Sequence, residues 1–517
     1  MDNKKAIIDI GSNTIRLIIY LIREEKMIKE IENIKISARL QNYINPKQEL
    51  NHEGMNVLLE ALMVFKEIIS QHKVSSSITV ATAAIRQAKN HDEIKKRIYD
   101  EIGFSIKILS GEEEAFYGFL GVIRATDIND GITIDLGGGS IEITQFLNRK
   151  MVRFHSFPIG VLTLNQHFVK NKIPTSDEIS NIANYLESKF QELEWLNNCR
   201  LPIIGIGGSA RNVGEIDQAI KNYPLPSIHR YELNLRDILM VKATLQSLSF
   251  QELQKVEGLS KERADIIFPA IEVFQSIYKI VNAPFFQLSE KGIRDGILFD
   301  AIKEHNLSEK DFHQNLEKNL QEIALEFDID LEKRVQQFNT VRKLFNSLMQ
   351  TGIVDVDDMD LNELRLASCL YNLGEFFEKD SVGPHTFYLI SNQSLDGFSH
   401  KNKIKIALLA SYQSKDSFKN FVRPFKDWFT KKERQKLRLL GSLLKLAFAL
   451  NRTKRDIIQD AKFHEDEDFL HLELYCNKSW KVEQQEADKQ IRHLEKSLGK
   501  TILLHFKKLQ TIWDEKS

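Results

Sequence analysis

A strand–turn–strand pattern that occurs twice constrains the fold of this 517-residue chain more than any other feature of its sequence. Residues 6–20 read "AIIDIGSNTIRLIIY", and residues 131–146 read "GITIDLGGGSIEITQF". In each copy an apolar run contains an aspartate, Asp9 or Asp135, a glycine turn follows, and alternating residues then indicate a second strand. We therefore expect two similarly built lobes, each with a glycine hairpin in its sheet.

The pattern of apolar residues divides the chain into four predicted parts. Strand and helix patterns alternate over residues 1–125 and again over residues 126–306, which is typical of an α/β sheet covered by helices. Helical periodicity alone runs over residues 307–453 and predicts an all-helical domain. Residues 454–517 contain two alternating runs, a polar helix and a further strand, so we expect a small α+β domain there.

Two further signals refine the prediction for the second lobe. Thr175 and Glu178 stand three residues apart before an apolar pattern, and this capping box predicts the start of a helix. A third strand runs into the glycines of "GIGGSARN", residues 205–212. Because ligands in open α/β sheets bind at loops that follow strand ends, we expect the three glycine turns to face one cleft.

The charge of the chain is balanced overall but uneven along its length. The chain has 71 Lys and Arg residues against 72 Asp and Glu residues, yet residues 401–455 contain 16 basic and only 3 acidic side chains. Such a run is either a solvated face or a surface that binds a polyanion. The residues predicted for such a surface are Lys431, Lys432, Arg434, Lys436 and Arg438.

The cysteines and the apolar runs favour a cytoplasmic protein. Cys199, Cys369 and Cys476 lie far apart, and no CxxC spacing suggests a zinc site or a disulfide framework. No apolar run approaches the roughly 18 residues that a membrane span requires. We therefore expect no membrane partner and no targeting segment.

The first two glycine turns differ from the common nucleotide-binding loops. Neither ends in Gly-Lys-Ser/Thr, and a strand pattern rather than a helix follows each. The backbone N–H groups of such a turn, with the hydroxyls of Ser12 and Ser140, can still surround an anion. The alternative is a hairpin that needs glycine only for its turn geometry.

Acidic residues flank the second glycine turn, where they would repel a bound phosphate. Mg²⁺ removes this conflict, because it takes one or two protein carboxylates and then oxygens of a substrate phosphate. Asp135 and Glu142 could supply those carboxylates. In a strand, Ser140 and Glu142 share one face, so we expect Glu142 to face the cleft while Ile141 and Ile143 enter the core. A solvated edge position for Glu142 is the alternative.

Six motifs together resemble the exopolyphosphatase and guanosine pentaphosphate phosphatase family. They are, in order, "DIGSNTIRL", "ATAAIRQAKN", "SGEEEA", "DLGGGSIEI", "GIGGSARN" and "SEKGIRDGIL", and the resemblance covers roughly the first 305 residues. It implies two lobes of the actin-like ATPase (ribonuclease H-like) fold with an active site in the cleft between them.

The resemblance also implies roles for individual residues. Glu114 would position and deprotonate the attacking water, and Arg86 would contact the transferred phosphoryl group. Asp135 and Glu142 would be associated with Mg²⁺, and Asp9 would hold a metal-bound water. The residues expected to line the phosphate sites are Ser12, Asn13, Gly138, Gly139, Ser140, Gly208 and Ser209.

The helical part resembles the third domain of the longer family members, which is related to metal-dependent His-Asp phosphohydrolases. The segment that should carry His-Asp reads "LASCLYNLGEFF", with Tyr371 and Asn372 in that place. We therefore expect a helical domain without metal ligands. The resemblance also suggests a homodimer with the C-terminal domains at its interface.

The sequence thus predicts an exopolyphosphatase that uses Mg²⁺ to release orthophosphate from the ends of inorganic polyphosphate. Removal of the terminal phosphate of guanosine pentaphosphate is the first alternative, and the basic run over residues 401–455 favours the longer polyanion. A non-enzymatic sensor of polyphosphate or nucleotide is the second alternative. No nucleic acid is expected as a partner.

Overall fold

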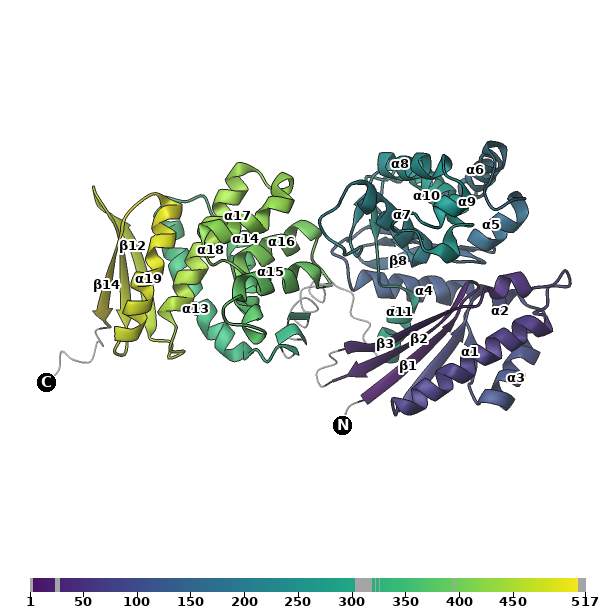
Figure 1. Ribbon diagram of the computed structural model, residues 1–517, viewed down its shortest axis with the longest axis horizontal. Coiled ribbons are helices and arrows are strands. Elements are labelled where there is room, and N and C mark those ends of the chain that lie inside the picture. The colour runs from purple at the N-terminus through teal and green to yellow at the C-terminus, as the bar shows by residue number, and fades with distance from the viewer. Residues whose placement is uncertain are drawn as a thin grey trace. The chain divides into compact units, whose positions relative to one another are not determined.

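The chain forms two compact units in this computed structural model. The structure describes residues 3–23, 28–302, 319–320, 322–324, 326–393 and 396–509. The first unit contains residues 1–223 and 227–316, and the second contains residues 224–226 and 317–517. The predicted boundary between residues 306 and 307 lies outside the described residues. Figure 1 shows the mixed α/β elements of the first unit and the helices and small sheet of the second.

The first lobe has a sheet with the strand order β3-β2-β1-β4-β5. Its strands are β1 (Asn3–Ile10), β2 (Thr14–Ile22), β3 (Ile28–Ser37), β4 (Ser76–Ala81) and β5 (Ile106–Ile108). Strand β1 pairs antiparallel with β2 and parallel with β4, so the first glycine turn closes a hairpin as predicted.

Both faces of this first sheet are buried. Ile8 and Leu17 pack on one face, among residues of α1 (His52–Gln71) and α3 (His91–Ile102), while Ile7 and Ile18 pack on the other. The alternation of side chains along each strand explains this division. A short helix, α2 (Ala83–Gln87), follows β4 at the edge of the cleft.

The second lobe repeats the hairpin design in a larger sheet with the order β10-β11-β9-β6-β7-β8. Its strands are β6 (Gly131–Leu136), β7 (Ile141–Leu147), β8 (Lys150–Phe157), β9 (Ile203–Ile206), β10 (Glu232–Leu233) and β11 (Phe286–Leu288). Its helices are α5 (Val161–Phe168), α6 (Ser176–Gln191), α7 (Gly207–Ile220), α8 (Leu235–Gln246), α9 (Phe250–Leu253) and α10 (Ile267–Val281). The predicted capping box begins α6, where the Thr175 side chain accepts from the Glu178 N–H.

Two helices connect the lobes through unusually close packing. Helix α4 (Gly111–Ile123) contacts β6, β7 and β8 of the second lobe, and α11 (Ile293–Ala301) contacts β1 of the first. The helices also pack against each other, and a Cβ added at Gly296 would lie only 2.0 Å from the Tyr117 carbonyl oxygen. A Cβ at Gly121 would lie 2.1 Å from the Gly292 oxygen. The two backbones are therefore in direct contact.

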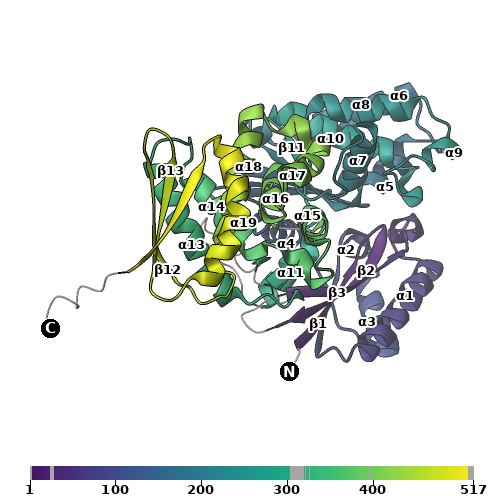
Figure 2. The same ribbon diagram turned by 60° about the vertical axis from the view of Figure 1, so that its left-hand side comes forward.

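The second unit is helical and ends in a small sheet. Its helices are α13 (Leu331–Gln350), α14 (Asp358–Leu370), α15 (Val382–Asn392), α16 (His400–Ala410), α17 (Lys415–Val422), α18 (Lys431–Leu450) and α19 (Lys481–Leu498). Its strands are β12 (Ile458–Glu465), β13 (Leu470–Cys476) and β14 (Ile502–Lys508), in that order in the sheet. Helix α18 packs against α13, α16 and α19, and Figure 2 shows α19 alongside α18.

Across the described part of the chain, no helix combines the length and apolar character needed to span a bilayer.

Candidate active site

The two glycine hairpins meet at the centre of the first unit. A Cβ added at Gly139 would lie 2.9 Å from the Ser12 hydroxyl oxygen, and one at Gly138 would lie 3.0 Å from the Ser12 Cβ. Any larger side chain at these positions would push the hairpins apart. The third glycine segment does not form the predicted turn. Gly207 and Gly208 instead begin helix α7 directly after β9.

A pocket of about 130 Å³ opens where the three glycine segments converge, and we refer to it as the cleft pocket. The predicted site residues on its wall are Asp9, Ser12, Asn13, Glu114, Asp135, Gly138, Ser140 and Gly208. The predicted residues Arg86, Gly139, Glu142 and Ser209 do not line it. Gly139 and Ser209 instead contact residues of the wall, namely Ser12 and Arg263.

The three glutamates at the start of α4 have different environments. Glu113 accepts from the Ser110 backbone N–H and completes a capping box, while Glu112 is exposed. Glu114 is only 5% exposed and faces the cleft pocket. The first turn of a helix favours acidic residues in general, so burial and position are what distinguish Glu114 from its neighbours.

Arg86 of α2 holds the Glu114 carboxylate in place. Its Nη1 atom lies 2.5 Å from Glu114 Oε2 and also donates to the Leu109 carbonyl oxygen at 2.9 Å. Its Nη2 atom lies 3.8 Å from Glu142 Oε1. Arg86 therefore contacts two buried carboxylates, and its predicted contact with phosphate stays a prediction.

Glu142 is buried behind the cleft pocket. It is 3% exposed and accepts a hydrogen bond from the Ser156 hydroxyl at 2.8 Å, so the alternative of a solvated edge residue is wrong. It pairs directly across the hairpin with Asp135, which places both acids on one face of the sheet. Ile141 and Ile143 belong to the core on the other face.

Burial and mutual repulsion raise the pKa values of these carboxyl groups. Burial raises the pKa of Glu114 to about 7, although Arg86 lowers it, and Asp135 and Asp9 raise it further. Burial and the charge of Asp9 raise the pKa of Asp135 to about 6. The pKa of Glu142 is also well above its usual range, because of burial and then Glu114. Their negative charges are therefore costly without a nearby cation.

Four arginines that were not predicted from the sequence line the cleft pocket. They come from four separate segments and are Arg16, Arg211, Arg263 and Arg294. Arg16, Arg211 and Arg294 lie within the six motifs, so their place in the site could have been predicted from the sequence. Arg263 lies in the segment "SKERAD", which contains no recognised motif. Burial, followed by the neighbouring charge of Arg294, lowers the pKa of Arg16 to about 10.

Two of these arginines have their positions fixed by identifiable contacts. Arg294 Nη1 lies 3.3 Å from Asp9 Oδ2, and Arg263 Nη1 donates to the Ser209 hydroxyl at 3.2 Å. A Cβ at Gly208 would lie 2.2 Å from Arg263 Nη2, so a side chain there would displace this guanidinium from its present position.

Several buried polar atoms in the cleft pocket have no hydrogen-bond partner. They include both amide atoms of Asn13 and the Nε atoms of Arg16 and Arg294. Leaving such groups unpaired costs free energy, so their presence together on one wall indicates a polar ligand. With four cations around them, the arrangement suits the oxygens of phosphate groups.

The acidic residues also fit a magnesium ion. No group of three or more His, Cys, Asp or Glu side chains forms a ready metal cage within the described residues. Mg²⁺ needs only one or two protein carboxylates, however, because water and substrate oxygens complete its shell. Asp9 and Asp135 both line the cleft pocket, and burial raises the pKa of each, so a bound cation would stabilise their charged forms.

The residues of the predicted polyanion surface lie at the start of α18, and acidic residues of the preceding helical region neutralise part of their charge. Lys432 pairs with Asp355 and Lys436 with Asp360, each at 2.8 Å. Arg434 and Arg438 donate to backbone oxygens, and Lys431 is exposed. The segment is therefore less cationic in space than in sequence, and its role stays a prediction.

Comparison with known proteins places this geometry in a family. The Ppx/GppA phosphatase family matches residues 18–305, and domain III of the same family matches residues 317–495. The guanosine-5'-triphosphate,3'-diphosphate pyrophosphatase of Photobacterium profundum is 24% identical over 416 residues, which are 78% of this chain and 79% of that protein. A bifunctional 3-dehydroquinate synthase/phosphatase of Fusobacterium nucleatum is 25% identical over 58% of this chain and 46% of its own length.

Solved structures agree with these matches. The Aquifex aeolicus member of the Ppx/GppA family is 26% identical, with a TM-score of 0.52, and covers 59% of this chain and 100% of its own. An exopolyphosphatase from Cytophaga hutchinsonii has 24% identity, a TM-score of 0.54 and the same coverage, and at that identity it shows the fold alone. The predicted actin-like ATPase fold of the two lobes is thereby confirmed. Because the family match spans more than half of the sequence, the chain belongs to the Ppx/GppA phosphatase family.

Proposed function

We propose that this protein is an exopolyphosphatase that uses Mg²⁺ to release orthophosphate from the ends of inorganic polyphosphate. As a member of its family, the chain is a hydrolase that acts on phosphoanhydride bonds. The size and lining of the cleft pocket support the choice of substrate. Its volume of about 130 Å³ is well below the roughly 300–1,000 Å³ typical of pockets for organic ligands, and four arginines line it. Such a pocket suits phosphate groups more than a nucleoside.

Glu114 would act as the general base of this reaction. Its pKa of about 7 lets it accept a proton from water near neutral pH, and Arg86 fixes the orientation of its carboxylate. Hydrolysis of a phosphoanhydride depends mainly on positioning and on stabilising charge on the phosphoryl oxygens. Arg16, Arg211 and Arg263 lie on the cleft-pocket wall and would supply that stabilisation.

A bound Mg²⁺ ion would neutralise charge on the substrate oxygens. Asp9 and Asp135 would hold it, because both line the cleft pocket. Glu142 would support Asp135 from the neighbouring position across the hairpin rather than from the pocket wall.

Hydrolysis of guanosine pentaphosphate is the second candidate. The relative from Photobacterium profundum is named a guanosine-5'-triphosphate,3'-diphosphate pyrophosphatase, and the match covers 79% of its length. Both candidates would use the same water, base and cation, so they differ only in what is bound beyond the scissile phosphate.

Side-by-side measurement of phosphate release from long-chain polyphosphate and guanosine pentaphosphate, with Mg²⁺ or with EDTA, tests the proposal. We expect faster release from polyphosphate and loss of release with EDTA. Glu114→Gln should lower kcat by about 10²-fold or more while affinity for polyphosphate stays nearly unchanged, because a base acts mainly in the transition state. Glu112→Gln, at an exposed position in the same helix turn, is the matched control.

Faster release from guanosine pentaphosphate would favour the second candidate. Binding of polyphosphate without hydrolysis of either substrate would instead support the non-enzymatic sensor. If Glu114→Gln kept near-normal kcat, the base would have to be another residue.

A further inference from the structure

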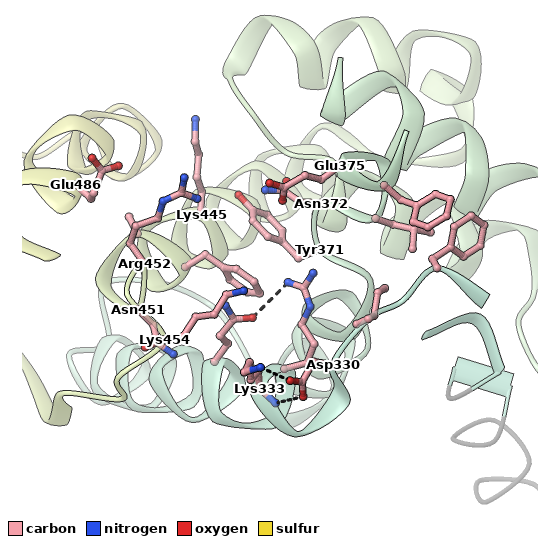
Figure 3. Close-up of a pocket in the computed structure, with 18 of the residues that line it drawn as sticks. Asp330, Lys333, Tyr371, Asn372, Glu375, Lys445, Asn451, Arg452, Lys454 and Glu486 are labelled. Atoms are coloured by element: carbon pink, nitrogen blue, oxygen red, sulfur yellow. Dashed lines mark hydrogen bonds and ion pairs between the residues drawn. The ribbon is translucent and has the colours of Figure 1, made fainter. Parts of the chain in front are cut away.

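A second cavity lies entirely within the helical unit, and we refer to it as the helical cavity. Its volume is about 480 Å³, within the range of pockets that hold small organic ligands. Residues before and within the first turns of α13, the turn after α14, the end of α18 and one face of α19 form its wall, as Figure 3 shows. Tyr371 and Asn372, which the sequence analysis singled out, lie on this wall.

Four cations of the helical cavity lack an ion pair. Lys333 pairs with Asp330, but among the described residues no carboxylate pairs with Arg334, Lys445, Arg452 or Lys454. Figure 3 shows Lys445 and Arg452 on the same side of the cavity, with Tyr371 and Asn372 opposite. Positive side chains that gather without ion-pair partners around a concave surface are suited to an anion.

Burial makes the charged forms of Lys445 and Arg334 less favourable. Lys445 Nζ donates to the Gln413 carbonyl oxygen at 2.5 Å, and burial lowers the pKa of Lys445 to about 8. Burial also lowers the pKa of Arg334, whose Nη1 donates only to the neutral Gln337 side chain, at 3.3 Å. A negative group entering the helical cavity would offset the desolvation of both cations.

Aromatic rings form the other part of the surface. Phe448 is partly exposed and is supported from behind by the buried Tyr371 ring, whose centroid lies 4.2 Å away, and the Arg334 guanidinium lies 5.4 Å from the Phe448 ring centroid. Side-chain amides of Asn372 and Asn451 stand beside them on the wall. Aromatic faces stack with planar rings, and amides form hydrogen bonds with the edges of such rings.

We propose that the helical cavity binds a nucleotide, with the base against Phe448 and the phosphate on the cations near Arg452. This binding site is separate from the cleft pocket and does not depend on the proposed hydrolysis. A long polyphosphate chain fits the helical cavity less well. It has no ring for the aromatic surface, and the acids Asp328, Glu375 and Glu486 in the same lining limit how many phosphate groups the cations can balance.

Calorimetric titration of the full-length protein with GMP and AMP tests this proposal, with inorganic tripolyphosphate as the comparison ligand. These mononucleotides contain no phosphoanhydride bond, so their titrations are independent of the proposed hydrolase activity. Tripolyphosphate contains such bonds and is therefore titrated with EDTA, and the part of its binding that Arg452→Glu removes is assigned to the helical cavity. We expect one site for at least one mononucleotide, with a Kd of about 10–500 µM. Tripolyphosphate should bind the helical cavity at least about tenfold more weakly than that mononucleotide.

Matched variants identify which surface binds. Arg452→Glu changes an exposed residue and should weaken mononucleotide binding by about tenfold or more, since it reverses a charge beside the phosphate. Phe448→Leu should weaken mononucleotide binding by about threefold or more without changing tripolyphosphate binding. Arg342→Glu, an exposed position on the same α13 helix, is the control and should change neither. Thermal unfolding would verify that each variant is folded.

Hydrogen exchange with bound GMP or AMP locates the site. Protection should appear in residues 327–337 and 445–454. Protection confined to residues 9–16 and 205–211 would mean binding in the cleft pocket and would overturn the proposal. So would the absence of binding by both mononucleotides up to about 1 mM, or equal loss of mononucleotide binding in Arg452→Glu and Arg342→Glu. Tripolyphosphate binding as tight as the mononucleotides would show that the helical cavity recognises phosphate alone.

Discussion

The two glycine hairpins have the same design but carry opposite charges at equivalent positions. In the first, Asp9 pairs across the strands with Arg16, and in the second, Asp135 pairs with Glu142. The backbone pattern and the aspartate are repeated, while the residue seven positions later changes from a cation to an acid. The first hairpin thus contributes the Arg16 guanidinium to the cleft pocket, while the second contributes the Asp135 carboxylate, with Glu142 buried behind it.

The equivalent aspartates therefore have different surroundings. Asp9 has Arg294 at 3.3 Å, and Arg16 and Arg294 both lower its pKa against the effect of burial. Asp135 has an acid across the hairpin, and its strongest charged neighbour is Asp9, which raises its pKa. A repeated hairpin can thus separate two tasks, with phosphate binding favoured at the first hairpin and cation binding at the second.

Replacing each aspartate with asparagine should separate these tasks most strongly. We expect Asp135→Asn to raise the Mg²⁺ concentration for half-maximal activity by about 10- to 100-fold, because Asp135 has more uncompensated negative charge. Asp9→Asn should raise the Mg²⁺ requirement less, and should mainly raise KM for polyphosphate, by about threefold to tenfold, because Arg294 loses the contact that fixes its position. Steady-state rates measured over a range of Mg²⁺ and substrate concentrations give both values. Equal shifts in the Mg²⁺ requirement of Asp135→Asn and Asp9→Asn would contradict the assignment of cation binding mainly to the second hairpin.

The pH dependence of the rate should show the raised pKa of Glu114, which is caused first by burial and increased further by Asp135 and Asp9. A base must be deprotonated, and the pKa of Glu114 is raised to about 7, so activity should rise as pH increases through 7. At saturating Mg²⁺ we expect kcat/KM to be about tenfold lower at pH 6 than at pH 8. Arg86→Met removes the cation that lowers this pKa, and should move the midpoint to higher pH. A rate that is constant or falls between pH 6 and pH 8 would contradict the assignment of Glu114.

The smallest effect is expected from the basic segment at the start of α18, which provides cations outside the cleft pocket. Lys431→Glu should weaken binding of long polyphosphate about twofold to threefold and reduce its dependence on salt, because each contact with a phosphate releases counterions. Lys432 and Lys436 already pair with acids, so charge reversal there should matter less. Binding measured at several salt concentrations checks this, with the exposed Lys66→Glu of α1 as control. Equal salt dependence in wild type and Lys431→Glu would identify the segment as an ordinary solvated face.

The sequence predicts local features of this protein well. The hairpins, the capping box at Thr175 and the strands of the C-terminal sheet all follow from periodicity and turn residues within short windows. The environment of Glu142 was only partly predictable. Alternation correctly separates it from Ile141 and Ile143, but the contacts with Ser156 and Arg86 that place it behind the cleft pocket depend on other segments.

Features that depend on distant segments could not be read in this way. Arg263 reaches the cleft pocket from a segment without a motif, because a glycine elsewhere lets its guanidinium cross the backbone. The acids that neutralise Lys432 and Lys436 precede them by more than 70 residues. Counting charges along the sequence therefore overstates the positive potential of that surface.

The contact between α4 and α11 has a mechanical consequence for the chemistry. Glu114 stands in the first turn of α4, and Arg294 stands in the first turn of α11. Because Gly121 and Gly296 bring the two backbones together, the proposed proton acceptor and a phosphate-facing cation belong to one rigid body. The spacing of the two backbones that carry Glu114 and Arg294 is therefore fixed by contact between main-chain atoms. An added methyl group at Gly296 would clash with the Tyr117 backbone, which lies outside the cleft pocket, and would misalign Glu114 and Arg294 from a distance.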